Sequence, residues 1–155
     1  MGAFQLWRIF VNPVFAPAIS AWFLAQMIKV ILTWITERRM DMSRFVGSGG
    51  MPSSHSALVM AVTTAIGLEQ GFDTSLFGLA LTLSLVVMYD AAGVRRAAGD
   101  QARTLNRIVG LLFGEEEFSH RELKELLGHK PVEVLAGALL GVATAAAFYC
   151  ISLIP

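Results

Sequence analysis

The apolar residues of the chain are gathered into four blocks that are separated by polar segments. The blocks cover about residues 14–36, 54–70, 75–96 and 131–154. A bilayer-spanning helix needs about 20 mostly apolar residues, and three of the blocks are that long. The block at 54–70 is shorter and reaches span length only with its flanking residues. The pattern predicts an all-α integral membrane bundle of four transmembrane helices in one domain over residues 1–155.

The composition supports a membrane protein and excludes other classes. The chain is 55% hydrophobic and only 15% charged, and its mean hydropathy is +0.60. Soluble domains are about 25% charged, and disordered chains are richer still in charge. The single Cys150 excludes a disulfide scaffold. The net charge of zero gives the chain no electrostatic reason to bind nucleic acid.

The charges of the connecting segments predict the orientation in the membrane. The connection between the first two blocks and the long connection at 97–130 are rich in arginine and lysine, whereas the one between the second and third blocks has only Glu69 and Asp73. Basic loops stay in the cytoplasm. We therefore expect a multi-pass protein of the plasma membrane with both termini outside, although Arg8 opposes this. The cytoplasmic loop 97–130 should hold a short helix at Ser119–Leu127, which a Ser119–Glu122 capping box would begin.

A glycine-rich segment, residues 47–56 (GSGGMPSSHS), leads into the second block. Gly50 and its neighbours allow close approach to a ligand, and Ser53 or Ser54 is suited to cap the helix that follows. A helix N-terminus presents free N–H groups to an anion such as phosphate, and His55 in the first turn could donate to it. The alternative is a flexible loop and a helix cap, with His55 exposed to solvent.

A second motif, residues 128–134 (GHKPVEV), begins the last block. Pro131 suits the first turn of a helix. His129 and Glu133 are four residues apart, so the carboxylate could orient the imidazole and leave its other nitrogen as a nucleophile or base. The alternative is that His129 only caps the helix and Glu133 extends to the interface. Small residues follow at helical spacing, and with so few spans they make a homodimer plausible: Gly137, Ala138, Gly141 and Ala145.

Further charged residues lie at the same predicted side of the membrane. Asp90 is near the inner end of the third block, and Arg95 and Arg96 follow it. Arginine binds phosphate with two parallel hydrogen bonds, although an Asp–Arg pair and a topology signal would explain the same residues. Lys29 lies about two turns from the inner end of the first block, where it could extend to the interface or reach a site from the side.

Three segments of the chain, residues 49–57, 89–96 and 128–137, together resemble the divergent type 2 phosphatidic acid phosphatase (PAP2) family. This family is related to the lipid phosphatases and the vanadium haloperoxidases, and the resemblance extends from Gln26 onward. The segment from Pro52 to His55 resembles the Pro-Ser-Gly-His signature, with Ser54 in place of glycine. His129 and Glu133 resemble the superfamily's histidine and the aspartate four residues after it.

The resemblance implies a role for each of these residues. His129 would be the nucleophile that forms a phosphohistidine, Glu133 would orient it, and His55 would protonate the leaving alcohol. Ser53 and Lys29 would hold phosphate oxygens. The chain departs from the superfamily in its arginines, because no Arg-Pro follows Lys29 and Leu123 stands where an arginine is expected. Our own inference is that one of three other arginines supplies the missing charge: Arg95, Arg96 or, with less support, Arg44.

These observations support three functional hypotheses. The first is a membrane phosphatase that hydrolyses a lipid or prenyl phosphate or diphosphate at the cytoplasmic interface. The second is a non-enzymatic protein that binds or transports lipid phosphates, and the third is a structural membrane subunit. None of the site residues requires a cofactor, although Asp90 with the acidic run Glu115–Glu117 could hold Mg²⁺.

Overall fold

The computed structural model describes residues 8–38, 50–113 and 128–154, and in these residues it contains helices and no strand. The helices are α1 (Phe15–Glu37), α2 (Ser54–Gln70), α3 (Ser75–Ala92), α4 (Val94–Phe113) and α6 (Pro131–Ser152). Many large apolar side chains on α1, α3 and α6 are exposed, as expected for a surface that faces lipid. The prediction of an all-α membrane helical bundle is confirmed.

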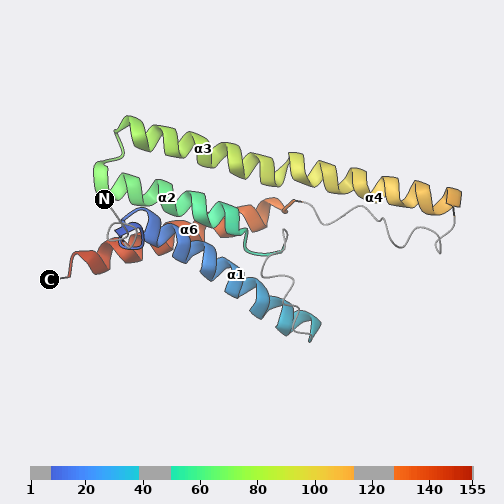
Figure 1. The fold of residues 1–155 in the computed structure, drawn as a ribbon, viewed down its shortest axis with the longest axis horizontal. Helices are drawn as coiled ribbons and strands as arrows, with labels where there is room; N and C mark the ends of the chain where they lie inside the picture. The colour runs from blue at the N-terminus through green and yellow to red at the C-terminus, as the bar shows by residue number, and fades with distance from the viewer. Residues whose placement is uncertain (1–7, 39–49, 114–127, 155) are drawn as a thin grey trace, which may run out of the picture.

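Four of the helices form an antiparallel bundle with α2 at its centre. α1 and α3 run in one direction and α2 and α6 in the other, and the start of α1 and the end of α6 lie at the same end of the bundle (Figure 1). α2 packs against α1, α3 and α6. The start of α2, the end of α3 and the start of α6 therefore lie at the opposite end of the bundle.

Three stretches in the described residues are long and apolar enough to cross a membrane, one fewer than the sequence analysis predicted. They are Phe15–Thr36, Ser75–Leu112 and Pro131–Ser152. α2 has 17 residues, which at 1.5 Å per residue span roughly 26 Å, less than the hydrocarbon core of a typical bilayer. Its buried positions include Ser54, Ser56 and Thr63. Because three other helices surround α2, it does not need the apolar surface of a lipid-facing helix.

The region after α3 also differs from the prediction. The third span was expected to continue to residue 96 and to be followed by a loop, but α3 ends at Ala92 and a second helix, α4, runs from Val94 to Phe113. The arginines of this segment indicated a cytoplasmic loop, and the helical spacing of the apolar residues between them was overlooked. The short helix predicted at Ser119–Leu127 lies outside the described residues.

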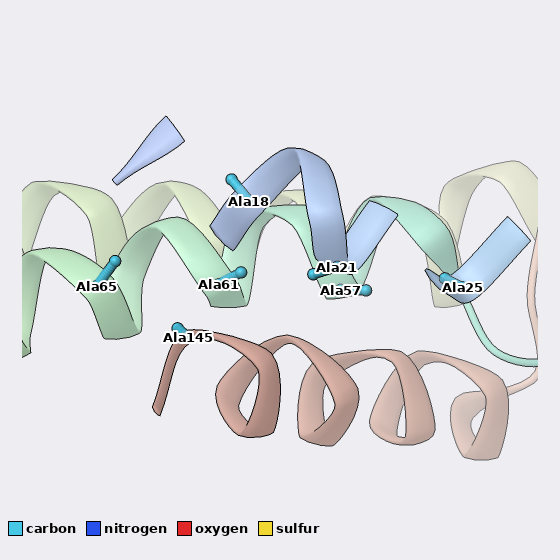
Figure 2. Close-up of a cluster of buried hydrophobic side chains, with 7 residues drawn as sticks. All are labelled: Ala18, Ala21, Ala25, Ala57, Ala61, Ala65 and Ala145. Atoms are coloured by element: carbon cyan, nitrogen blue, oxygen red, sulfur yellow. The ribbon is translucent and has the colours of Figure 1, made fainter. Parts of the chain in front are cut away.

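The core of the bundle is a seam of alanines where α1, α2 and α6 meet. Ala18, Ala21 and Ala25 of α1 face Ala57, Ala61 and Ala65 of α2, and Ala145 of α6 completes the cluster (Figure 2). Small side chains allow helix backbones to approach closely, which is how helices associate in lipid, where the hydrophobic effect does not drive them together.

The contact between α2 and α6 is the closest example of such packing. A Cβ atom added at Gly137 would overlap the carbonyl oxygen of Ser53, and one added at Gly141 would overlap that of Ala57. The small-residue stripe of the last helix therefore packs against α2 within the chain. The homodimer stays a prediction. Because the stripe that partly suggested it is occupied within the chain, a dimer would have to form through a different surface.

Candidate functional site

Backbone hydrogen bonds tie three helix ends together at one end of the bundle. The Ser53 N–H, just before α2, donates to the carbonyl oxygen of Glu133 in α6 (2.9 Å). The His129 N–H, just before α6, donates to the carbonyl oxygen of Ala91 in α3 (2.9 Å). These bonds bring the two histidine motifs of the sequence to the same place.

His129 and Glu133 form the contact that their spacing suggested. Nδ1 of His129 lies 2.9 Å from Oε2 of Glu133, and the same oxygen accepts from the backbone N–H of Lys130 (3.2 Å). A carboxylate can only accept, so Nδ1 carries the hydrogen, and a neutral ring then has its lone pair on Nε2. His129 is 5% exposed. The pair is therefore a buried, oriented imidazole whose second nitrogen is free to act as a base or nucleophile.

His55 and His129 line the same small cavity. It has a volume of about 20 Å³, enough for one water molecule. His55 itself is exposed in the first turn of α2. Phosphate is larger than water, so it would enter only if the exposed side chains at the rim moved outward. The remaining lining comes from the end of α3 and the segments beside it: Val87, Asp90, Ala91, Arg95 and Gly128.

Arg95 at the rim of this cavity is paired with Asp90. Its Nε donates to Oδ2 of Asp90 at 2.6 Å, and the two side chains are 52% and 38% exposed. The Asp–Arg pair that the sequence allowed is therefore formed, and Arg95 also lines the cavity. Because a guanidinium has five N–H groups in a fixed fork, donors remain on Arg95 for a second anion.

Lys29 lies in the interior of the bundle. It is 3% exposed, and its Nζ donates to Oε1 of Gln26 (3.0 Å) and Oγ of Ser54 (3.3 Å). Its aliphatic stem passes Gly50, where an added Cβ would lie 3.9 Å from it. An ammonium group has three hydrogens, so the two bonds leave one donor. Lys29, Ser54 and Gly50 thus form a second group, linked to the histidines through the Ser53–Glu133 bond.

Ser53 caps α2, one of the two positions that the sequence indicated. It is fully buried, and its Oγ accepts from the backbone N–H and the hydroxyl of Ser56 at 3.3 and 2.9 Å. The oxygen is thus occupied as an acceptor, and Ser53 could reach a phosphate only through its own hydroxyl hydrogen. Arg96 is exposed and does not line the cavity. Several other candidate residues lie outside the described residues: Arg44, residues 47–49, Glu115–Glu117 and Leu123.

Gly128 is a residue of the site that the sequence analysis included in the second motif without giving it a role. Its φ is +93°, and an added Cβ would overlap the backbone of Arg95 and Arg96. Only glycine adopts such a conformation easily and leaves this space. Gly128 thus lets the start of α4 pack directly against the turn that presents His129. Its position immediately before His129 is the signal that could have identified it.

The described residues contain no cluster of three histidine, cysteine, aspartate or glutamate side chains that could hold a metal ion. The expectation that Asp90 and the Glu115–Glu117 run could bind Mg²⁺ is untested, because the acidic run lies outside the described residues. A larger cavity, about 320 Å³, opens at the opposite end of the bundle beside Phe10, Glu69 and Tyr149. Neither His55 nor His129 lines it.

Comparison with known proteins identifies the family. Residues 10–144 match the model of the Divergent PAP2 family. The chain is also 41% identical over 136 residues to the uncharacterized membrane protein YuiD of Bacillus subtilis (strain 168), a match that covers 81% of this chain and 86% of the relative. No solved structure matches the chain. The chain belongs to the Divergent PAP2 family, as its three motifs predicted.

Proposed function

We propose that this protein is a membrane phosphatase that hydrolyses a lipid or prenyl phosphate or diphosphate with His129 as its nucleophile. The observation that carries the proposal is the buried His129, whose Nδ1 lies 2.9 Å from the Glu133 carboxylate, beside a cavity that His55 also lines. An imidazole oriented by a carboxylate is an activated nucleophile, and a second histidine beside it can transfer protons to and from the reacting groups.

The first step would form a phosphoenzyme. The Nε2 lone pair of His129 attacks the phosphorus, a P–N bond forms, and the bond from phosphorus to the ester oxygen breaks in line with it. His55 gives its proton to the departing alkoxide, which leaves as the alcohol. The negative Glu133 stabilises the positive charge that develops on the His129 ring.

The second step would return the free enzyme. The neutral His55 takes a proton from water, the water oxygen attacks the phosphorus, and the P–N bond breaks to give inorganic phosphate. In both steps the equatorial phosphate oxygens carry negative charge that needs positive partners. Arg95 lines the cavity, and Lys29, which does not line it, would have to reach the phosphate past its partner Ser54. Lys29 and Arg95 would supply the positive charge that other members of the superfamily obtain from arginines absent from this chain.

The surroundings of the site favour a substrate with an apolar tail. Val86 and Tyr89 near the end of α3, and Val132 and Leu135 at the start of α6, are all at least 59% exposed. They make the bundle surface apolar up to the level of the histidines. A lipid whose tail lies in the bilayer would present its phosphate at this level, whereas a soluble phosphate gains nothing from such a surface.

The proposal is tested by phosphate release from a panel of lipid and prenyl phosphates and diphosphates. The wild-type protein in detergent or liposomes should release phosphate, and His129→Ala should reduce the rate by at least about 1,000-fold. His120→Ala, the same change at the chain's third histidine, serves as the matched control. Equal rates for wild type and His129→Ala would reject the histidine mechanism.

Binding without turnover is the second candidate function, and one observation favours it. The cations near the site are already engaged, Lys29 with Gln26 and Ser54, and Arg95 with Asp90. Such an arrangement suits a protein that holds a lipid phosphate without stabilising a transition state. Saturable binding of a lipid phosphate, lost in Lys29→Ala and accompanied by no phosphate release, would establish this function in place of hydrolysis.

A further inference from the structure

α4 has an apolar stripe that no helix of the bundle covers. With 100° between successive residues, six apolar side chains lie on one side of α4: Val94, Ala98, Leu105, Ile108, Val109 and Leu112. Of these, Val94, Leu105, Ile108 and Leu112 are 47–70% exposed. Beyond its first turns α4 extends past α1, α2 and α6 (Figure 1). Among the described residues, no helix packs on this part of the stripe.

The other side of α4 is basic. Arg96, Arg103 and Arg107 lie opposite the stripe, Arg95 lies at its edge, and Asp100 is the one acidic residue of the helix, so α4 carries a net charge of +3. Asp100 lies 3.6 Å from Arg103 and offsets part of that charge. A helix with an apolar stripe and an arginine-rich polar face is typical of segments that lie in the interface of an anionic membrane.

The position of α4 in the chain also suits a membrane surface. α4 begins directly after α3, and the candidate span Ser75–Leu112 includes both helices, with its uninterrupted apolar run in α3. Gly93 separates the two helices, and its ψ of −80° departs from helical geometry. In the structure α4 continues in nearly the same direction as α3 (Figure 1). To lie along a membrane surface, α4 has to bend at this break.

We propose that α4 is a membrane-surface helix that binds anionic lipid. It turns at Gly93, places Leu105, Ile108 and Leu112 at the boundary between headgroups and acyl chains, and directs Arg103 and Arg107 to lipid phosphates. A second copy of the chain fits the stripe less well. Two α4 helices packed along it would cover the apolar residues, but their arginine-rich faces would point away from the contact, where the second copy offers no anionic surface. The proposal does not depend on the proposed hydrolysis.

Spin labels on the full chain test this placement. In a Cys150→Ser background, which removes the exposed free thiol, single cysteines would replace Leu105, Ile108 and Leu112 on the stripe, and Asp100 and Arg103 on the polar side. The protein would be reconstituted in phosphatidylcholine with phosphatidylglycerol, and in phosphatidylcholine alone. Collision rates with oxygen, which concentrates in the bilayer, and with a water-soluble nickel chelate report the depth of each label.

In anionic liposomes the ratio of oxygen to nickel collisions should be at least about twofold higher for the stripe labels than for the polar-side labels. This difference should shrink in phosphatidylcholine alone. The collision ratio of a label at Leu112 should also fall when Arg103→Gln and Arg107→Gln are added. Stripe labels open to nickel would place α4 in water, and stripe labels shielded from both reagents with dipolar broadening would place it against a second copy. Either of these results would overturn the proposal. So would a difference between stripe and polar-side labels that does not change with the charge of the lipid.

Discussion

Glu133 connects the two histidine motifs through both its backbone and its side chain. Its carboxylate accepts from the His129 ring and from the Lys130 N–H, and its carbonyl accepts from the N–H of Ser53, two residues before His55. One residue thus orients the proposed nucleophile and fixes the α6 turn against the α2 turn. Because the carbonyl bond is independent of the side chain, a substitution at Glu133 can change the chemistry and leave this joint in place.

Glu133→Gln should lower the rate of phosphate release by at least about 100-fold. The amide oxygen can still accept the Nδ1 hydrogen, so the ring stays in position, but the negative charge that supports the developing imidazolium is lost. The measurement is the initial rate on the best substrate of the panel. Glu69→Gln, the same change at an exposed carboxylate at the other end of the bundle, is the matched control. Similar rates in the two variants would show that Glu133 is only a helix-capping residue.

Lys29→Met tests whether the buried cation contributes to anion binding. Methionine has nearly the length of lysine and no charge, so the variant should keep the fold and lose a charge-assisted hydrogen bond to the phosphate. Such a bond is worth about 1.5–3 kcal/mol, so the inhibition constant of vanadate, a transition-state analogue, should rise by about tenfold or more. A thermal midpoint close to that of the wild type would verify folding. An unchanged inhibition constant in a folded variant would remove Lys29 from the site.

At this scale the residue types and spacings anticipated much of the geometry. The four-residue spacing of His129 and Glu133 was enough to predict their contact, and a serine before an apolar run was enough to predict the α2 cap. Of the two partners of Lys29, Gln26 lies one turn earlier in the same helix, whereas Ser54 depends on how α1 meets α2, which spacing within one helix does not show. The pairing of Arg95 with Asp90 was foreseen only as an alternative, since a sequence does not show which charges meet.

At the scale of the elements, the α2–α6 contact is the structure on which the site depends. Both histidines are presented by the first turns of these helices or the residues just before them, and the helices meet through Gly137 and Gly141 with no side chain between the backbones. The sequence predicted the stripe but not its partner. α4 was not predicted for a different reason. Its four arginines indicate a cytoplasmic loop, although the apolar residues between them recur at helical spacing.

Gly141→Ala should destabilise the protein, because its Cβ would overlap the Ala57 carbonyl oxygen and would force α2 and α6 apart. Overpacking of this kind costs about 1–3 kcal/mol. Gly78→Ala in α3 is the matched control, since its Cβ would meet nothing within 4 Å, and it should be neutral or slightly stabilising. Thermal unfolding in detergent measures both. Equal midpoints for the two variants would contradict the close packing of α2 and α6.

At the scale of the whole molecule, the bundle joins an apolar exterior to a polar site at one end. The block pattern was sufficient to predict the helical class and the approximate bounds of α1, α2 and α6. It did not distinguish α2, which is central and enclosed, from the helices that face lipid, because hydropathy reports the apolar content of a segment but not its neighbours. The basic loops further predict that the histidine end faces the cytoplasm.

This orientation is testable in intact cells with a membrane-impermeant maleimide. In the Cys150→Ser background, Asp73→Cys, between α2 and α3, should be labelled from outside, and Thr104→Cys in α4 should be labelled only after the membrane is permeabilised. The reverse pattern would place the site outside the cell. Labelling of both positions in intact cells would contradict a bundle that crosses the membrane between them.

The most direct test of the account is to trap the phosphoenzyme with a ³²P-labelled aryl phosphate. Its good leaving group needs no proton from His55, so His55→Ala should still form the P–N bond but hydrolyse it slowly. Label should therefore accumulate on His129 of this variant, stable to alkali and labile to acid, and it should disappear when His129→Ala is added. Turnover without labelled protein, or labelling that survives His129→Ala, would contradict the proposed nucleophile.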